Sequence, residues 1–421
     1  MYELADTNVI AGGGRTLLKR RALTHVSRTV ILLGLTSMLT DISSEMVNAI
    51  LPLYLVFALG MSPLQFGVID GIQQGAASLV RVFGGFAADR LGRYKEVAGF
   101  GYGLSAFCRI GFLVAGKSLS VIGTVVFLDR TGKGIRTAPR DALISLSTPT
   151  EKLGTAFGVH RALDTAGAMI GPLLAFGMLV EAPQDFHPIF VVSLCFALVG
   201  LAILLLFVEN NPERLKTAPA KPITVGDIGR LWQIPGFSSL VIAGTLLATA
   251  TMSDGFIYLG LQQKLGFAAR DLPLLYVVTS LFYMALSLPV GRLADRIGRG
   301  RVFVGGYALL LLVYAALVLP SLSNIGIVIV LLGFGCYYAA TDGVLMALAS
   351  SLLPKSVRAT GLSALVTVTN LGRLVASIAF GAAWTLIGLH AAVCVFGVAL
   401  AISAVGAGVL LAKRSRATAD A

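Results

Sequence analysis

One nine-residue phrase occurs twice in the chain, each time between two long apolar runs. The first copy, GFAADRLGR, occupies residues 85–93, and the second, GRLADRIGR, occupies residues 291–299. About half of the 421-residue chain separates them. Each copy is predicted to be a short charged turn between two membrane-spanning segments, so the protein is predicted to consist of two similar halves.

The composition indicates a membrane protein. Hydrophobic residues make up 56% of the chain and charged residues only 13%, and the mean hydropathy is +0.85. Soluble domains carry about 25% charged residues. We therefore expect an all-α protein whose helices lie in a lipid bilayer.

The net charge of +12 would indicate a nucleic-acid partner in a soluble protein. Here the basic residues gather before the first span (Arg15, Lys19, Arg20, Arg21), in the central loop (Arg214, Lys216, Lys221, Arg230) and near the C-terminus (Lys413, Arg414, Arg416). The loops on the opposite side hold little beyond Lys117, Lys264 and Arg270. Because basic loops stay on the cytoplasmic side, we predict a multi-pass protein of the inner (plasma) membrane with both termini in the cytoplasm, and no nucleic-acid partner.

Each repeated phrase holds an aspartate among arginines, with glycines at matching positions. The arginines alone would suit a simple membrane anchor. Glycine allows close helix contact, and an aspartate among arginines can pair with them and release again. The phrase resembles the G-x-x-x-D-R-x-G-R loop signature of the major facilitator superfamily of secondary transporters. The gating residues that this resemblance implies are Gly85, Asp89, Arg90, Gly92 and Arg93 in the first copy, and Gly291, Asp295, Arg296, Gly298 and Arg299 in the second.

The resemblance implies twelve transmembrane helices in two pseudo-symmetric six-helix bundles, with a substrate site between them near the bilayer midplane. The expected organisation is a cytoplasmic leader (1–27), an N-terminal bundle (28–208), a proline-containing cytoplasmic linker (209–236), a C-terminal bundle (237–412) and a cytoplasmic tail (413–421).

The first predicted span, residues 30–59, carries Asp41, Glu45 and Asn48 at positions i, i+4 and i+7. This spacing places all three on one helical face. Because an ionised group facing lipid is costly, the face is predicted to look into the protein or into water. It either serves substrate or protons, or forms structural bonds to neighbouring helices.

The fourth predicted span, residues 119–140, is unusually cationic. Its charged stripe consists of Asp129, Lys133, Arg136 and Arg140. Asp129 and Lys133 could pair at i, i+4. Beside the stripe, Arg130 with Gly134 and Ala138 resembles the superfamily's fourth-helix signature, which is associated with proton coupling, although the three other cations depart from it.

The fifth predicted span, residues 155–180, carries Gly158, Gly167 and Gly171-Pro172. Their spacing resembles the fifth-helix signature of the superfamily's exporters, but Ala175-Phe176 replaces its closing glycine pair. The alternative interpretation is a tightly packed helix that has no role in transport direction.

In this superfamily the first, fourth, seventh and tenth helices line the central cavity. The expected substrate and proton residues, including two from the fifth span, are Asp41, Glu45, Asn48, Arg130, Lys133, Arg136, Arg161, Asp164, Asp254, Tyr337, Tyr338 and Asp342. The mechanism implied is alternating access. Asp41 or Glu45 would take up a proton on one side and release it on the other.

The most favoured function is proton-coupled efflux of a small molecule or drug by a chain that works as a monomer. An alternative interpretation is that the cationic fourth span binds the substrate. It predicts an anionic metabolite or metal chelate that is moved by exchange or co-transport. A non-transporting sensor or scaffold is a third interpretation. An enzyme is not expected, because no catalytic set of residues is evident.

No metal, disulfide or cofactor is expected. The four cysteines lie in apolar runs without C-x-x-C spacing and are predicted to be free, buried thiols, and the four histidines are scattered. The glycines around Lys133 do not form a G-x-x-x-x-G-K-[ST] phosphate loop, so nucleotide binding is rejected.

Overall fold

The computed structural model describes residues 27–149, 152–183, 185–209, 231–234, 236–319, 323–354 and 357–417, and in these ranges every regular element is a helix. The predicted leader up to residue 26, linker residues 210–230 and the last four residues of the tail lie outside the described residues. So do the side chains of residues 82–87, 89 and 413–417. The roles predicted for Gly85 and Asp89 therefore stay predictions.

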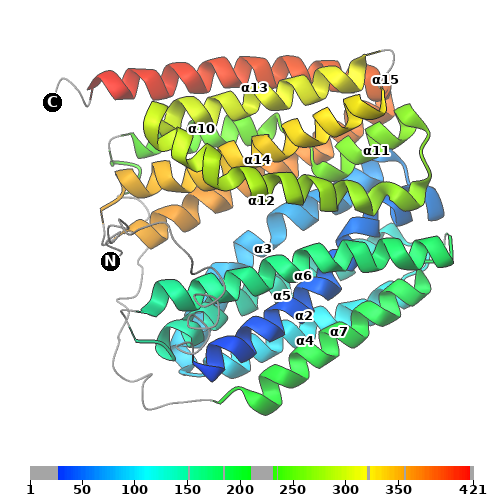
Figure 1. Cartoon of the computed structure of the whole chain (residues 1–421), viewed down its shortest axis with the longest axis vertical. Coiled ribbons are helices and arrows are strands. Elements are labelled where there is room, and N and C mark those ends of the chain that lie inside the picture. Colours follow the sequence, from blue (N-terminus) through cyan, green and yellow to red (C-terminus); the bar gives the residue numbers. More distant parts are fainter. Residues whose placement is uncertain are drawn as a thin grey trace, which may run out of the picture.

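The first half of the chain forms six long helices, drawn in the lower part of Figure 1. They are α2 (Arg28–Leu53) with its continuation η1 (Tyr54–Ala58), α3 (Pro63–Leu91), α4 (Tyr94–Val114), α5 (Leu119–Leu146), α6 (Leu153–Glu181) and α7 (His187–Phe207). Within this half, α2 packs on α6 and α7, and α5 packs on α3 and α4.

The second half occupies the upper part of Figure 1. It consists of α10 (Phe237–Thr249), α11 (Asp254–Leu265), η3 (Ala269–Asp271), α12 (Leu272–Ile297), α13 (Arg299–Val318), α14 (Asn324–Leu352) and α15 (Arg358–Ala417). The long element α15 is two helices joined at Gly388, whose φ of 81° and ψ of 164° are not helical. Only glycine adopts such a backbone conformation readily.

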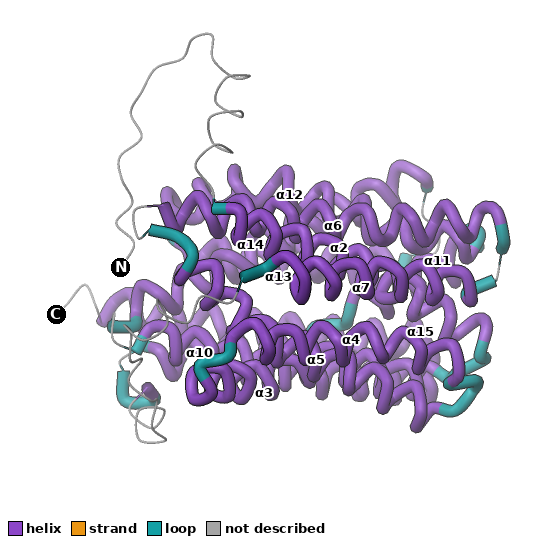
Figure 2. Tube along the Cα trace, turned by 90° about the horizontal axis from the view of Figure 1, so that it is seen from below, coloured by secondary structure: helices purple, strands orange, loops and turns teal. Residues whose placement is uncertain are grey.

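Nine helices among the described residues are long and apolar enough to cross a membrane. Helices α3 and α5, which carry polar and charged residues in their middle, fall outside this set, and α15 counts once despite its break. The predicted all-α membrane fold is thus confirmed, whereas the number of twelve spans stays a prediction. Figure 2 shows the helices running roughly side by side along one direction.

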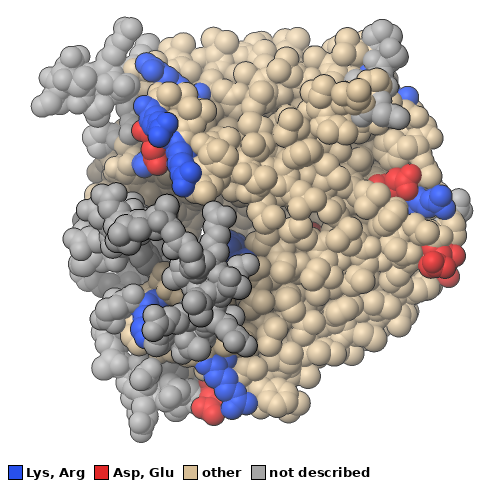
Figure 3. Space-filling model, viewed as in Figure 1, with Lys and Arg blue, Asp and Glu red and all other residues tan. Residues whose placement is uncertain are grey.

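On the outer face drawn in Figure 3, charged side chains lie mainly at the two ends of the helices. Figure 3 shows Lys, Arg, Asp and Glu at the left and right edges, with a broad band between them almost free of charged residues. We call the left end, where α3 and α12 finish, the repeat-turn end, and the opposite end the far end. A band without charge is the surface expected for contact with lipid tails.

The two repeated turns occupy helix ends. Gly92, with φ of 63°, caps α3, and Gly298, with φ of 104°, ends α12. Asp295 accepts hydrogen bonds from Arg299 at 2.8 Å, within one turn and largely exposed. A Cβ added at Gly291 would meet no atom within 4 Å, so this glycine does not serve the close helix contact expected of it. Arg90, Arg93 and Arg296 are exposed.

The two halves meet along α3 and α15. A Cβ added at Gly67 would lie 2.5 Å from the Ser377 carbonyl oxygen, and one at Gly71 would lie 2.9 Å from that of Leu374. Such distances mean that the helix backbones touch, as small residues allow. We call this contact the α3–α15 seam. A second contact between the halves joins α6 and α12.

Three hydrogen bonds cross the α3–α15 seam. The backbone N–H of Leu64 donates to Thr385 Oγ1 at 3.0 Å, Ser377 Oγ donates to Asp70, and Asn370 Nδ2 donates to Ser78 Oγ at 2.5 Å. They run from the far end to the middle of the helices. The described hydrogen bonds of the seam thus involve residues 64–78 of α3.

The prediction that all four thiols are free and buried is half right. All four are free, but Cys195 and Cys394 are exposed and only Cys108 is fully buried. The outward faces of membrane helices contact lipid, and an apolar run therefore does not distinguish a core position from a lipid-facing one.

The glycines of the fifth predicted span pack α6 against α2. A Cβ at Gly167 would lie 2.4 Å from the Met38 carbonyl oxygen, and one at Gly171 would lie 2.7 Å from that of Ile42. Gly158 has nothing within 4 Å of such a Cβ, and Pro172 is buried inside α6. Two of the three glycines thus have a packing role.

We expect Gly167→Ala to lower the melting temperature of the purified protein, because the added methyl group must displace a helix backbone. Overpacking of this kind costs about 1–3 kcal/mol. Gly158→Ala is the matched control on the same helix and should be neutral or slightly stabilising. Equal melting temperatures for the two variants in detergent would contradict the packing role of Gly167.

Candidate functional site

A buried arginine of α4 lies at the centre of the first half. The Arg109 side chain is 1% exposed and its Nη2 is 3.0 Å from Asp129 Oδ1 on α5. Arg109 also donates to the hydroxyls of Ser43 and Ser44 on α2, at 3.2 and 3.1 Å. One guanidinium therefore joins three helices, as expected where a charge is removed from water.

The same aspartate holds a second arginine. Arg130 Nη2 lies 3.4 Å from Asp129 Oδ2 and donates to Asn48 Oδ1 at 2.6 Å. Asn48 Oδ1 also accepts from Gln73 of α3 at 3.2 Å. The buried Nε of Arg130 has no hydrogen-bond partner among the described residues. This predicted site residue thus has one donor group that is not used by the described part of the protein.

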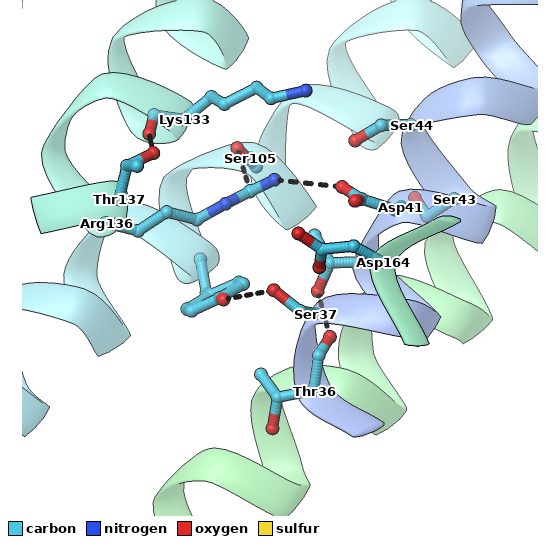
Figure 4. A network of polar contacts seen from close by, with 12 residues as sticks. Thr36, Ser37, Asp41, Ser43, Ser44, Ser105, Lys133, Arg136, Thr137 and Asp164 are labelled. Atoms are coloured by element: carbon cyan, nitrogen blue, oxygen red, sulfur yellow. Dashed lines mark hydrogen bonds and ion pairs between the residues drawn. The ribbon is translucent and has the colours of Figure 1, made fainter. Parts of the chain in front are cut away.

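Figure 4 shows Arg136 of α5 reaching toward Asp41 of α2. The closest atoms are 3.9 Å apart, and Arg136 Nη1 donates to Ser105 Oγ of α4 at 3.0 Å. The Arg136 guanidinium also lies 4.6 Å from the centre of the Tyr102 ring, a cation–π distance. Asp41 and Arg136 are therefore partners of one another.

Lys133 differs from the arginines around it. The expected pair between Asp129 and Lys133 is not formed, because Asp129 is engaged by Arg109 and Arg130. In Figure 4 the amino end of Lys133 extends past the network without a contact. Among the described residues it makes no side-chain hydrogen bond or ion pair, and it is half-buried.

Toward the repeat-turn end, Arg140 links α5 to α2 and α6. It donates to Ser37 Oγ at 2.8 Å and to Asp141 at 2.9 Å, and lies 3.9 Å from Asp164. His160 Nδ1 is also 3.9 Å from Asp164, yet neither ring nitrogen has a hydrogen-bond partner in the described part of the chain. Arg161 is exposed on α6.

The helix of the second half that corresponds to α2 is broken. Residues 250–253, between α10 and α11, are not helical. The backbone N–H of Met252 in this segment donates a hydrogen bond to the hydroxyl of Tyr314 on α13 at 2.6 Å. Asp254 then begins α11 and accepts a hydrogen bond from the Tyr338 hydroxyl of α14. Irregular backbone in a membrane protein is tolerated where the protein itself provides partners.

The other predicted residues of the second half differ in their surroundings. Tyr337 is buried among aromatic rings, 5.3 Å from that of Tyr307. Asp342 is exposed. Arg373 of α15 interacts electrostatically with Asp254 and Asp342 but has no ion pair within 4 Å among the described residues.

Glu45 is a predicted site residue of the first half that acts on a residue of the second half. It is half-buried on α2 and makes no hydrogen bond or ion pair in the described part of the chain, while its charge acts on Asp254 of the second half. The structure thus brings Asp41, Asn48, Arg130 and Arg136 into one network. It leaves the side chains of Glu45 and Lys133 without a hydrogen bond or ion pair to the described residues.

The family of the chain follows from the comparison with known sequences. A family model described as Major Facilitator Superfamily matches residues 33–377 and 240–421. The chain belongs to the major facilitator superfamily. An uncharacterised MFS-type transporter of Methanocaldococcus jannaschii is 32% identical over 372 residues, which cover 86% of this chain and 89% of that protein.

A second relative of this superfamily protein has a named substrate. The cis,cis-muconate transport protein of Acinetobacter baylyi is 23% identical over 342 residues, covering 76% of this chain and 79% of the relative. Among solved structures, the nucleoside transporter NupG superposes with a TM-score of 0.76 at 14% identity, over 92% of this chain and 99% of the other. A POT family transporter in complex with 5-aminolevulinic acid gives a TM-score of 0.74 at 15% identity, over 92% and 96%. These structures share the fold, and the family is one of transporters rather than enzymes.

Three buried groups of this superfamily member escaped the sequence analysis as site residues. They are Arg109, His160 and Asp70. Arg109 and Asp70 are isolated charges inside apolar helices, and that feature alone could have identified them, because intramembrane charges are rare and need partners. No group of three metal-ligating side chains occurs in the described part of the chain.

We expect Arg109→Met to destabilise the protein strongly, by about 3–5 kcal/mol, because it leaves Asp129 buried without its closest cation. The double variant Arg109→Met/Asp129→Asn should recover part of this loss, since no buried carboxylate then lacks its closest cation, while Arg130 keeps its hydrogen bond to Asn48. Thermal unfolding in detergent measures both effects.

Arg81→Gln is the control for the loss of an arginine. Arg81 is 3.8 Å from Asp141 but half exposed, and exposed pairs contribute only about 0–1 kcal/mol. A melting temperature of the Arg109 variant as high as that of Arg81→Gln would contradict the central role of the pair.

Proposed function

We propose that this protein is a proton-coupled secondary transporter of a small organic molecule and works by alternating access. The observation that carries the proposal is the state of the intramembrane carboxylates. Asp254 is held by a tyrosine hydroxyl and Glu45 has no described partner, and neither forms an ion pair with a cation among the described residues. A carboxylate that forms no ion pair can gain or lose a proton without breaking one.

Of the two residues first expected to carry the proton, we keep Glu45 and replace Asp41 by Asp254. Asp41 faces Arg136, whose other amino group binds Ser105, so this carboxylate already has a partner in the protein. Glu45 and Asp254, which interact electrostatically across the halves, are therefore the better candidates for proton uptake and release.

An organic anion is the substrate class that we place first. Lys133 has an ammonium group without a described partner, and Arg130 keeps a buried Nε that no described residue binds. Cationic groups that the protein leaves free can bind a carboxylate. The resemblance to a muconate transport protein supports the same class, because muconate is a dicarboxylate.

Efflux of a small molecule or drug in exchange for protons is the second candidate. It is favoured by the fifth-helix motif and by the carboxylates Glu45 and Asp342. The packing role of Gly167 and Gly171 accounts for part of that motif without reference to direction, which is why we place this candidate second.

The test of proton coupling is substrate-induced proton movement in vesicles that contain the purified protein. We expect Glu45→Gln and Asp254→Asn each to abolish proton movement while substrate exchange across the membrane continues, because exchange requires no net protonation change. Asp41→Asn is the matched control and should retain proton movement. Normal coupling in both the Glu45 and the Asp254 variant would overturn the proposal.

Substrate class is tested with a panel of organic anions and lipophilic cations. We expect the protein to respond to anions, and Lys133→Met to raise the KM for the responding anion about tenfold or more, since a hydrogen bond to a charged group contributes about 1.5–3 kcal/mol. A response to lipophilic cations alone, with Lys133→Met unchanged, would favour drug efflux instead.

A further inference from the structure

Asp70 is a carboxylate placed between the two halves. It belongs to α3 of the first half, is 7% exposed, and accepts a hydrogen bond from Ser377 of α15 in the second half. Ser377 is itself 1% exposed. The bond therefore joins two groups that are both removed from water, and it exists only while the α3–α15 seam is closed.

The surroundings of Asp70 supply the hydroxyl of Ser377 rather than a cation. Ser253, the residue before α11, and Gln74, one turn along α3, are the other polar side chains that act on Asp70. Asp70 has no ion pair within 4 Å among the described residues. Enclosing an ionised carboxylate without a cation is far more costly than enclosing the neutral acid.

Several charged or titratable groups lie on the elements packed around α3. They are Asp254 of α11 and Tyr276 of α12, which both interact electrostatically with Asp70, together with Arg373 of α15, Asp129 and Arg130 of α5, and Glu45 of α2. Neither arginine forms an ion pair with Asp70, and Asp254 adds a like charge near it. The described residues around the closed seam therefore offer an ionised Asp70 no cationic partner within ion-pair distance.

The seam is closely packed on both sides of this group. Gly67, Gly71 and Gly75 present a stripe of α3 that lies directly on α15, and a Cβ at Gly75 would be 2.6 Å from a Leu374 methyl group. Opening the far end must separate these backbones and expose Asp70 to water, where a carboxylate ionises at neutral pH.

We propose that Asp70 is the proton-controlled lock of the far end: the α3–α15 seam closes over the protonated carboxyl group and opens when the carboxylate is ionised. In the closing step, Asp70 takes up one proton from the solution at the far end and becomes neutral, and in the opening step it returns one. The inference rests on the proposed alternating-access function, to which it adds the residue that couples proton binding to closure.

The experiment measures the width of the far end as a function of pH. Spin labels are attached to cysteines introduced at Lys117 and Arg270, two exposed residues in far-end loops of different halves, after replacement of the four native cysteines. Distances are recorded in the full-length protein in lipid nanodiscs, without substrate, from about pH 5 to about pH 9.

We expect one short distance in acid and a growing population of longer distances as the pH rises. Asp70→Asn cannot ionise and should keep the short distance at every pH. Ser78→Ala is the matched control, since it removes a seam hydrogen bond that involves no titratable group, and it should keep a pH-dependent distance.

Two outcomes would overturn the inference. One is a pH response that persists in Asp70→Asn. The other is a distance in the unsubstituted protein that does not change with pH, a result that no folding defect of a variant can obscure. Failure of the proposed function would look different: no substrate of the panel would move protons in vesicles, while the distance and its dependence on Asp70 would remain.

Discussion

A charged side chain inside a bilayer must find its partners within the protein, and the first half of this chain is arranged around that requirement. Arg109 and Asp129 are almost completely buried and bind one another at 3.0 Å. Because Arg109 also binds two serines of α2, the pair fixes α2, α4 and α5 relative to each other. The charges of α5 nearer the repeat-turn end then take partners from α2 and α6.

The second half meets the same requirement with hydroxyl groups. Asp254 binds the Tyr338 hydroxyl, and the interrupted backbone before it binds Tyr314. A carboxylate bound by hydroxyls can gain or lose a proton without breaking an ion pair, whereas one bound by arginine resists protonation. In the proposed mechanism this difference gives Asp129 a structural role and Asp254 a coupling role. Glu45 of the first half, which forms no ion pair with the described residues, shares the coupling role.

Close backbone contacts occur both within the first half and between the two halves. Glycines on α3 let the first half lie directly on α15, and glycines on α6 do the same against α2 within one half. The α2–α6 contact belongs to a bundle that moves as a unit in alternating access. The α3–α15 contact lies between the units, so in the proposed mechanism a titratable group placed there, Asp70, responds to their separation.

The sequence by itself determined the class of fold and the position of most polar groups. Apolar runs and the repeated phrase predicted an all-α membrane protein, since only helices satisfy the backbone over such lengths, and helical spacing placed Asp41 and Asn48 on one face, where both contact α5. Only the tertiary structure decided which charges are partners. Spacing favoured a pair between Asp129 and Lys133, but Arg109, from another helix, binds Asp129 instead. Partner choice depends on the approach of helices distant in the chain, and helical periodicity carries no information about that approach.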